Sequence, residues 1–179
     1  AACAYDKTAP VVTDSSPATG TTGDSYTFHA IASDTIGSIS NLYVEYWFGS
    51  GSETNSTMTH TTANNYELGV TIPPNSLDTL HYRIVVVDMA SNWNSTTERD
   101  IAINDNDNPI ANAGLDQSVD EGTTVTFNGS GSTDNIGITN YTWTFTYNGT
   151  TQTLYGISPT LQFWTIENYT VTLNVSDAA

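Results

Sequence analysis

One acidic, proline-ended segment occurs twice in this chain, 99 residues apart. Residues 6–10 (DKTAP) align with residues 105–109 (DNDNP), and further segments repeat in the same order, such as 33–37 (SDTIG) and 133–137 (TDNIG). Several matches in one order, at a spacing that differs by at most one residue, indicate a duplicated unit. The sequence therefore predicts two domains in tandem rather than one large one.

The repeat also sets the expected boundaries. We expect an Ig-like domain over residues 6–104, an acidic linker over 105–109 and a second domain over 110–179. Each domain is long enough to bury a hydrophobic core. Cys3 is the single cysteine, so no disulfide can form within the chain.

The two ends of the sequence leave two interpretations open. Residues 1–5 align with the end of a last strand, whereas the second domain stops after its sixth strand. The chain is then a fragment of a longer repeat protein, or residues 1–5 are a donor segment that completes the second domain of a neighbouring subunit. Strand addition of this kind would produce a strand-exchanged surface filament.

The pattern of apolar residues is typical of strands throughout. Residues 26–31 and 124–127 alternate between the two faces of a strand, and residues 42–48, 81–87, 141–147 and 169–175 are rich in aromatic and β-branched residues. Glycine, asparagine, aspartate and proline separate these runs. The sequence predicts an all-β protein made of two tandem Ig-like β-sandwiches, the second of which lacks its own last strand.

Four motifs in the second half are similar to those of a known family. Residues 109–114 (PIANAG), 129–134 (GSGSTD), 141–145 (YTWTF) and 169–177 (YTVTLNVSD) carry this similarity. Through them, residues 107–179 resemble a PKD domain, the Ig-like module named after polycystin. The family usually continues the Trp-x-Phe motif with Gly-Asp-Gly, whereas residues 146–149 here read TYNG, so we expect a different turn.

The first half resembles Ig-like or fibronectin-like modules of microbial surface proteins. Residues 88–92 (DMASN) are similar to the Asp-x-Ala-Gly-Asn turn of such modules. The two resemblances together imply an extracellular, cell-surface spacer or adhesive module that is not an enzyme.

The charge balance narrows the possible partners. The chain has 19 acidic residues against 3 basic ones, which gives a formal net charge of −16. Nucleic acids and anionic membranes require lysine and arginine, so both are excluded as partners. Cations, neutral glycans, surface proteins, and neighbouring domains or subunits of the same protein remain.

The acidic residues are predicted to gather at one tip of each sandwich. In such a fold the entering chain, the loop after the second strand and the loop after the sixth strand meet at the same end. Calcium takes six to eight oxygen ligands from carboxylates and carbonyls, so we expect structural Ca²⁺ at these tips. The alternative is that these side chains only cap turns. The candidate ligands are Asp6, Asp34, Asp88 and Asn92 in the first domain, and Asp105, Asp107, Asp134 and Asp177 in the second.

Two further kinds of site are candidates. Trp93 and Trp164 are candidates for stacking on a sugar or a partner. Five Asn-x-Ser/Thr sequons lie outside the predicted strands and are the candidate glycosylation sites, and Asn140 and Asn174 are in sequons within strands. The five are Asn55, Asn94, Asn128, Asn148 and Asn168.

These observations favour a non-catalytic structural or adhesive segment of an extracellular repeat protein, made rigid by calcium at its domain junctions. The alternative is an accessory module of a secreted hydrolase that binds the substrate. Exposed aromatic side chains and retention on an insoluble glycan distinguish the second possibility.

Overall fold

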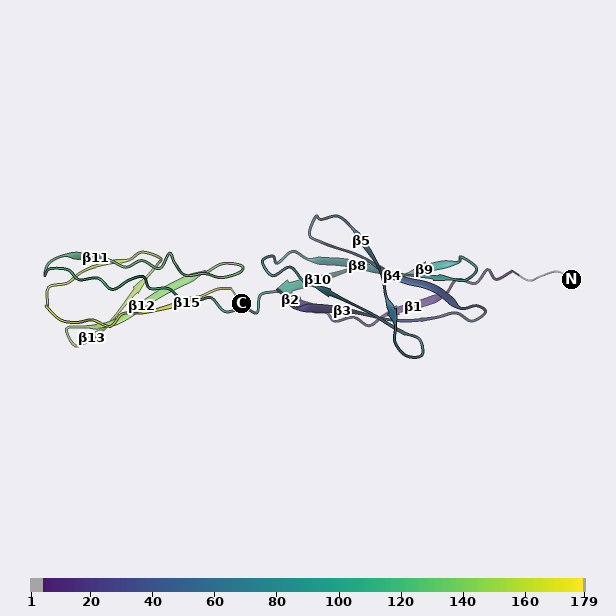
Figure 1. The fold of residues 1–179 in the computed structure, drawn as a ribbon, viewed down its shortest axis with the longest axis horizontal. Coiled ribbons are helices and arrows are strands. Elements are labelled where there is room, and N and C mark those ends of the chain that lie inside the picture. Colours follow the sequence, from purple (N-terminus) through teal and green to yellow (C-terminus); the bar gives the residue numbers. More distant parts are fainter. Residues whose placement is uncertain (1–4, 179) are drawn as a thin grey trace. The chain divides into compact units, whose positions relative to one another are not determined.

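The computed structural model describes residues 5–178, and every regular element in this range is a β-strand (Figure 1). The chain divides into two compact units, one ending at Asn104 and the other beginning at Asp105. The all-β prediction is confirmed. No helix of the described residues is long and apolar enough to cross a membrane. Residues 1–4 of the predicted donor segment lie outside the described range.

The first unit contains two sheets. The smaller sheet has the order β1-β3-β7-β6, and the larger one has the order β2-β10-β8-β4-β5, with β9 also paired to β8. The strands are β1 (Val11–Asp14), β2 (Thr19–Thr21), β3 (Ser25–Ser33), β4 (Ile39–Phe48), β5 (Thr54–Thr57), β6 (Thr59–His60), β7 (Asn65–Thr71), β8 (Leu80–Asp88), β9 (Trp93–Ser95) and β10 (Arg99–Asn104).

The period-two pattern of the strands builds the core between these sheets. Because successive side chains of a strand point to opposite faces, every second residue of β3, β4, β8 and β10 enters one hydrophobic cluster. Phe28 from the smaller sheet contacts Tyr82 from the larger one, with ring centroids 4.8 Å apart. The first unit is therefore a two-layer β-sandwich.

The same alternation fixes what the larger sheet presents on its outer face. On β8, His81, Arg83 and Val85 alternate with the buried Tyr82 and Ile84. On the neighbouring β4 and β10, the odd-numbered residues 43–47 and the even-numbered residues 100–104 take the corresponding outward positions. This outer face carries polar and aromatic side chains that the core does not use.

The second unit has a smaller core around Trp143, which is 1% exposed. One sheet has the order β13-β12-β15, and β11 pairs with β14 in the other. Phe127 and Phe163 from the β11–β14 side pack against Phe145 on β12, with ring centroids 5.6 and 5.8 Å away. The strands are β11 (Thr124–Thr126), β12 (Asn140–Tyr147), β13 (Thr150–Tyr155), β14 (Thr160–Gln162) and β15 (Thr172–Ser176).

The last strand of the second unit begins later than its sequence pattern predicts. The pattern marks residues 169–175, whereas β15 starts at Thr172. The Tyr169 ring packs 4.8 Å from the Phe163 ring, and its hydroxyl donates to the Thr165 carbonyl oxygen. Tyr169 therefore fills the core from a loop position, and an apolar alternation alone does not separate this role from a strand.

Candidate metal centres

Three carboxylates converge at one end of the first unit. Asp6 precedes β1, Asp34 directly follows β3, and Asp88 ends β8. One oxygen from each of the three lies within 4.8 Å of the others. Asp34 and Asp88 stand at strand ends, and Asp6 lies in the segment that leads into β1. The topology therefore brings together side chains that are far apart in sequence.

Backbone amides hold these carboxylates in place. Asp6 Oδ1 accepts from the Thr8 amide at 2.8 Å, and Asp34 Oδ1 accepts from the Ile36 amide at 3.0 Å. Asp88 Oδ1 accepts from the amides of Ala90 and Asn92 at 2.7 and 2.8 Å. Each carboxylate therefore caps its own turn, as the alternative interpretation expects.

Turn capping leaves other oxygens of this cluster without a role. Oδ2 of Asp6 and Oδ2 of Asp34 are buried, and neither has a hydrogen-bond partner among residues 5–178. A buried polar atom without a partner costs free energy. Both oxygens face Gly37, where an added Cβ would lie 3.1 and 3.2 Å from them. The space beside Gly37 thus keeps two unsatisfied anionic oxygens close together.

The surroundings of Asp88 favour its ionised form. Asp88 is 1% exposed. Burial tends to raise the pKa of Asp88, but the donors of Asn92 and Ala90 outweigh it and hold the pKa below its usual value. Asn92, a predicted ligand, donates from Nδ2 to Asp88 Oδ2 at 2.7 Å and to the Asp6 carbonyl oxygen at 3.3 Å. The Asn92 side-chain amide therefore links two residues of the cluster, Asp6 and Asp88, by hydrogen bonds.

The second unit repeats this arrangement with its own residues. Asp105, Asp134 and Asp177 place one carboxylate oxygen each within 4.8 Å of the others. Asp134 Oδ2 accepts from the amides of Ile136 and Gly137 at 2.9 and 2.6 Å. Its Oδ1 is buried and has no hydrogen-bond partner in the described part of the chain. One oxygen caps the turn while the other has no hydrogen-bond partner among the described residues, as in Asp34 of the first unit.

Asp107 lies outside this second cluster. It is exposed. Its Oδ2 accepts from Asn135 Nδ2 at 3.0 Å, and the same Nδ2 lies 3.2 Å from Asp105 Oδ1. Asp107 is thus linked to the cluster through Asn135 and does not belong to it. The acidic residues of the linker made Asp107 a candidate ligand. Its hydrogen bond from Asn135, which lies in the loop before β12, could not be predicted from that pattern.

The groups of three are suited to a hard cation in composition and charge. Every ligand is an oxygen, and each cluster carries three formal negative charges, which is the type of ligand set that Ca²⁺ takes. The sequence does not indicate that Gly37 leaves space for two carboxylates, because such a glycine cannot be told from any other turn glycine by its sequence context.

The comparisons with known proteins bear on the second unit. Residues 106–179 match the family model of the PKD domain. The second unit is a PKD domain. PKD domains are generally non-catalytic modules and are typical of extracellular proteins.

The chain was also compared with solved structures and with curated proteins. A solved structure described as fibronectin(III)-like modules of CbhA from Clostridium thermocellum is 15% identical to the chain, with a TM-score of 0.37. That match covers 94% of this chain and 86% of the other. No curated protein matches the chain.

The predicted glycosylation sites are accessible in both units. All seven sequon asparagines are exposed. In the PKD domain, Asn128 Oδ1 accepts from the Ser130 amide, and Asn148 Oδ1 accepts from the Thr165 hydroxyl. In the first unit, Asn94 Nδ2 donates to the Pro10 carbonyl oxygen at 3.0 Å. A glycan on Asn94 would have to replace that hydrogen bond.

The two candidate stacking residues are exposed. Trp93 on β9 is 65% exposed and Trp164 in the PKD domain is 66% exposed. Trp164 lies against Gly122, whose added Cβ would be 3.1 Å from the indole ring. Trp93 lines a groove of about 440 Å³ on the outer face of the larger sheet, together with Tyr43, Val85 and Val87.

Proposed function

We propose that the chain is a calcium-stabilised structural or adhesive segment of an extracellular cell-surface repeat protein. The observation that carries this proposal is the convergence of three carboxylates, from three separate segments, in each of the two units. Its expected partners are neighbouring domains or subunits of the same protein, glycans or other surface proteins.

Electrostatics supports an ion in these clusters. Two carboxylates 4.8 Å apart repel by on the order of 3 kcal/mol at an effective dielectric constant of about 20, and the cluster of the PKD domain contains three such pairs. A divalent cation among them turns this repulsion into attraction. The gain is available only in the folded state, since the three segments are far apart in an unfolded chain.

The chain sequence relates the second cluster to the junction between units. Asp105 is the first residue after Asn104, the last residue of β10. A calcium ion held by Asp105 therefore restricts the backbone directly after the first unit. We expect calcium to stiffen the connection between consecutive domains of the parent protein.

The test is a thermal melt of the full chain in chelator and in about 10 mM Ca²⁺. Extracellular calcium modules bind with Kd of about 0.1–1 mM, so this concentration stabilises a unit by about 1.5–3 kcal/mol. For a domain of this size the melting temperature rises by roughly 6–24 °C. The rise should be larger than that given by the same concentration of Mg²⁺, which fits all-protein oxygen sites poorly.

Matched variants assign the effect to the clusters. Asp34→Asn should remove the calcium response of the first unit, and Asp134→Asn that of the PKD domain. Asp78→Asn and Asp116→Asn change exposed carboxylates outside both clusters and should leave both responses intact. Coincident melts with and without calcium would show that the carboxylates are turn caps only, and a response retained in both cluster variants would place the ion elsewhere.

The outer groove of the first unit supports a second candidate function, the binding of polysaccharide as an accessory module. Trp93 and Tyr43 provide aromatic surface, and the Arg83 guanidinium in the groove is paired with Glu45. A pull-down on insoluble glycans tests this possibility. Retention of the chain that is lost in Trp93→Ala but kept in Trp164→Ala supports binding through the groove, and no retention on any glycan excludes it.

A further inference from the structure

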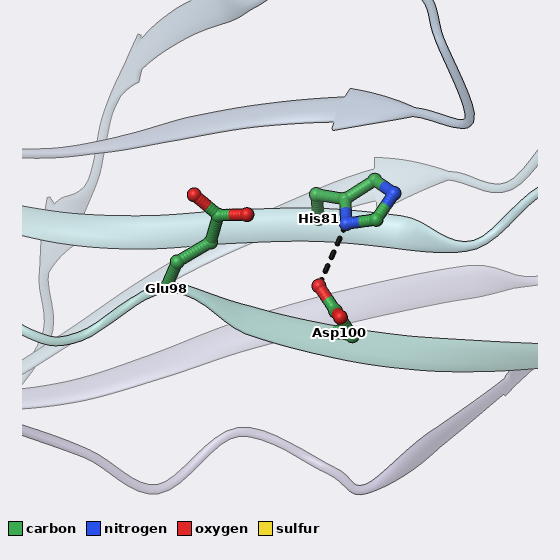
Figure 2. Close-up of side chains that lie close together, drawn as sticks. All are labelled: His81, Glu98 and Asp100. Atoms are coloured by element: carbon green, nitrogen blue, oxygen red, sulfur yellow. Dashed lines mark hydrogen bonds and ion pairs between the residues drawn. The ribbon is translucent and has the colours of Figure 1, made fainter.

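Three side chains of types that can bind a metal gather on the outer face of the first unit, at the opposite end of β8 from Asp88 and its acidic cluster. His81 and Asp100 are direct cross-strand partners on β8 and β10, and Glu98 lies directly before β10, two residues before Asp100. One ligand atom from each lies within 4.8 Å of the others. Figure 2 shows the Asp100 carboxylate directed at the His81 imidazole, and Glu98 on the segment that leads into the strand of Asp100.

The composition of this group differs from that of the acidic clusters. One imidazole nitrogen and two carboxylates form a mixed nitrogen–oxygen set, which suits Zn²⁺ and similar transition ions rather than Ca²⁺. We propose that His81, Glu98 and Asp100 form a binding site for a divalent transition-metal ion of the zinc type. Nothing in the calcium proposal requires this site, because it shares no residue with either acidic cluster.

The observed distances are compatible with such an ion. His81 Nδ1 lies 2.7 Å from Asp100 Oδ1, as a direct hydrogen bond. Two ligands of a tetrahedral zinc ion stand about 3.4 Å apart, given metal–ligand distances of about 2.0–2.2 Å. The pair has to open by less than 1 Å for the ion to enter, and Nδ1 exchanges its proton for the metal.

The surroundings hold the imidazole while leaving the carboxylates accessible. The Trp47 indole stacks on the His81 ring, with centroids 5.4 Å apart and planes inclined by 19°. The His81 side chain is 23% exposed, whereas that of Asp100 is 69% exposed. An ion can therefore reach the site from solvent, and water fills the coordination positions that the three side chains leave open.

The first unit also supplies a matched control. His29 and Glu67 are cross-strand partners on β3 and β7, with Nδ1 and Oε1 3.3 Å apart. This pair has the same chemistry as His81 and Asp100, but the described residues place no third ligand beside it. If a histidine–carboxylate pair alone were enough, both sites would bind equally.

The experiment is a calorimetric titration of the tag-free full chain with Zn²⁺ in saturating Ca²⁺. Cys3→Ser is present in every sample so that the thiol does not contribute. We expect one zinc ion per chain, and a loss of affinity of roughly tenfold or more in His81→Gln and in Glu98→Gln, since even indirect supporting groups cost that much. His29→Gln should bind as tightly as the parent.

Fluorescence gives a second, independent measurement. Cu²⁺ bound beside His81 should quench Trp47, because its ring is stacked on the ligand, and Zn²⁺ should reverse the quenching by competition. In Trp47→Phe the quenching should fall while the zinc affinity stays within a few-fold of the parent. The proposal is overturned if no zinc binds in saturating calcium, or if His81→Gln binds as tightly as the parent.

Discussion

Asp14 joins the two sheets of the first unit, and its removal should be costly. It ends β1 in the smaller sheet and contacts residues of β8 and β10 in the larger one. Its Oδ1 accepts from the Ser16 amide and hydroxyl at 2.8 and 2.6 Å. Its Oδ2 accepts from the Tyr82 hydroxyl at 2.7 Å and from Arg99 Nη1 at 2.5 Å.

The substitution Asp14→Asn keeps the shape of this side chain and removes its charge. Hydrogen bonds to charged groups contribute about 1.5–3 kcal/mol, and the Asp14 side chain is only 7% exposed. Arg99 is 33% exposed, so water takes over part of its lost pairing. We therefore expect a loss of about 2 kcal/mol, which lowers the melting temperature of the first unit by about 8–16 °C.

The pH dependence of this loss follows from the Asp14 pKa. Burial tends to raise this pKa, but hydrogen bonds from Ser16, Arg99 and Tyr82 outweigh it and hold it below 3.8. A depressed pKa stabilises the fold at pH values above the unfolded-state pKa of about 3.9. The stabilisation is lost as the pH falls through the folded-state pKa. The difference in stability between parent and variant should therefore be largest above about pH 5 and should disappear in stronger acid.

Differential scanning calorimetry of both proteins from pH 7 down to acid measures this difference. Glu67→Gln breaks an exposed pair with His29 and should cost less than about 1 kcal/mol at every pH. Equal melting temperatures for Asp14→Asn and the parent at pH 7 would refute the structural role of Asp14. A difference that stayed constant into strong acid would refute the electrostatic explanation.

Two further substitutions follow from packing. Trp143→Ala should destabilise the PKD domain by about 3–5 kcal/mol, seen as the selective loss of its transition in chemical denaturation, because Trp143 is 1% exposed at the centre of that core. Gly37→Ala places a methyl group 3.1–3.2 Å from the cluster oxygens of Asp6 and Asp34, so it should weaken the calcium response of the first unit in calcium-dependent melts while that of the PKD domain persists.

The fold was largely predictable because, in a β-sandwich, every second side chain of a strand faces the core and is apolar. The inward residues Phe28, Leu42, Ile84 and Trp143 are the apolar members of alternating runs, and the structure buries all four. A loop position can imitate this alternation, as Tyr169 does. Sequence periodicity then extends a strand beyond the point where its backbone pairing begins.

The candidate sites were predictable only as far as topology alone places residues. Strand ends meet at a tip in any such sandwich, so Asp34 and Asp88 could be assigned to one end without knowledge of the register. The group at His81 depends on the register between β8 and β10. The strand that lies between these two in the sequence, β9, also pairs with β8, so the chain between β8 and β10 is not a simple hairpin. No pattern in the sequence fixes that register, and the contact between Asp14 and Arg99 depends on it as well.

We propose an ion, rather than turn capping alone, as the explanation of the two acidic clusters. Capping explains why Asp34 and Asp134 each accept backbone amides from their own turns. It does not require carboxylates from separate turns to lie close together, because each cap is satisfied within its own turn. Convergence within 4.8 Å adds repulsion that capping does not repay. A bound cation would give this arrangement a physical reason. Because the arrangement occurs in both units, we expect each calcium response to be removed separately by a single Asp→Asn substitution.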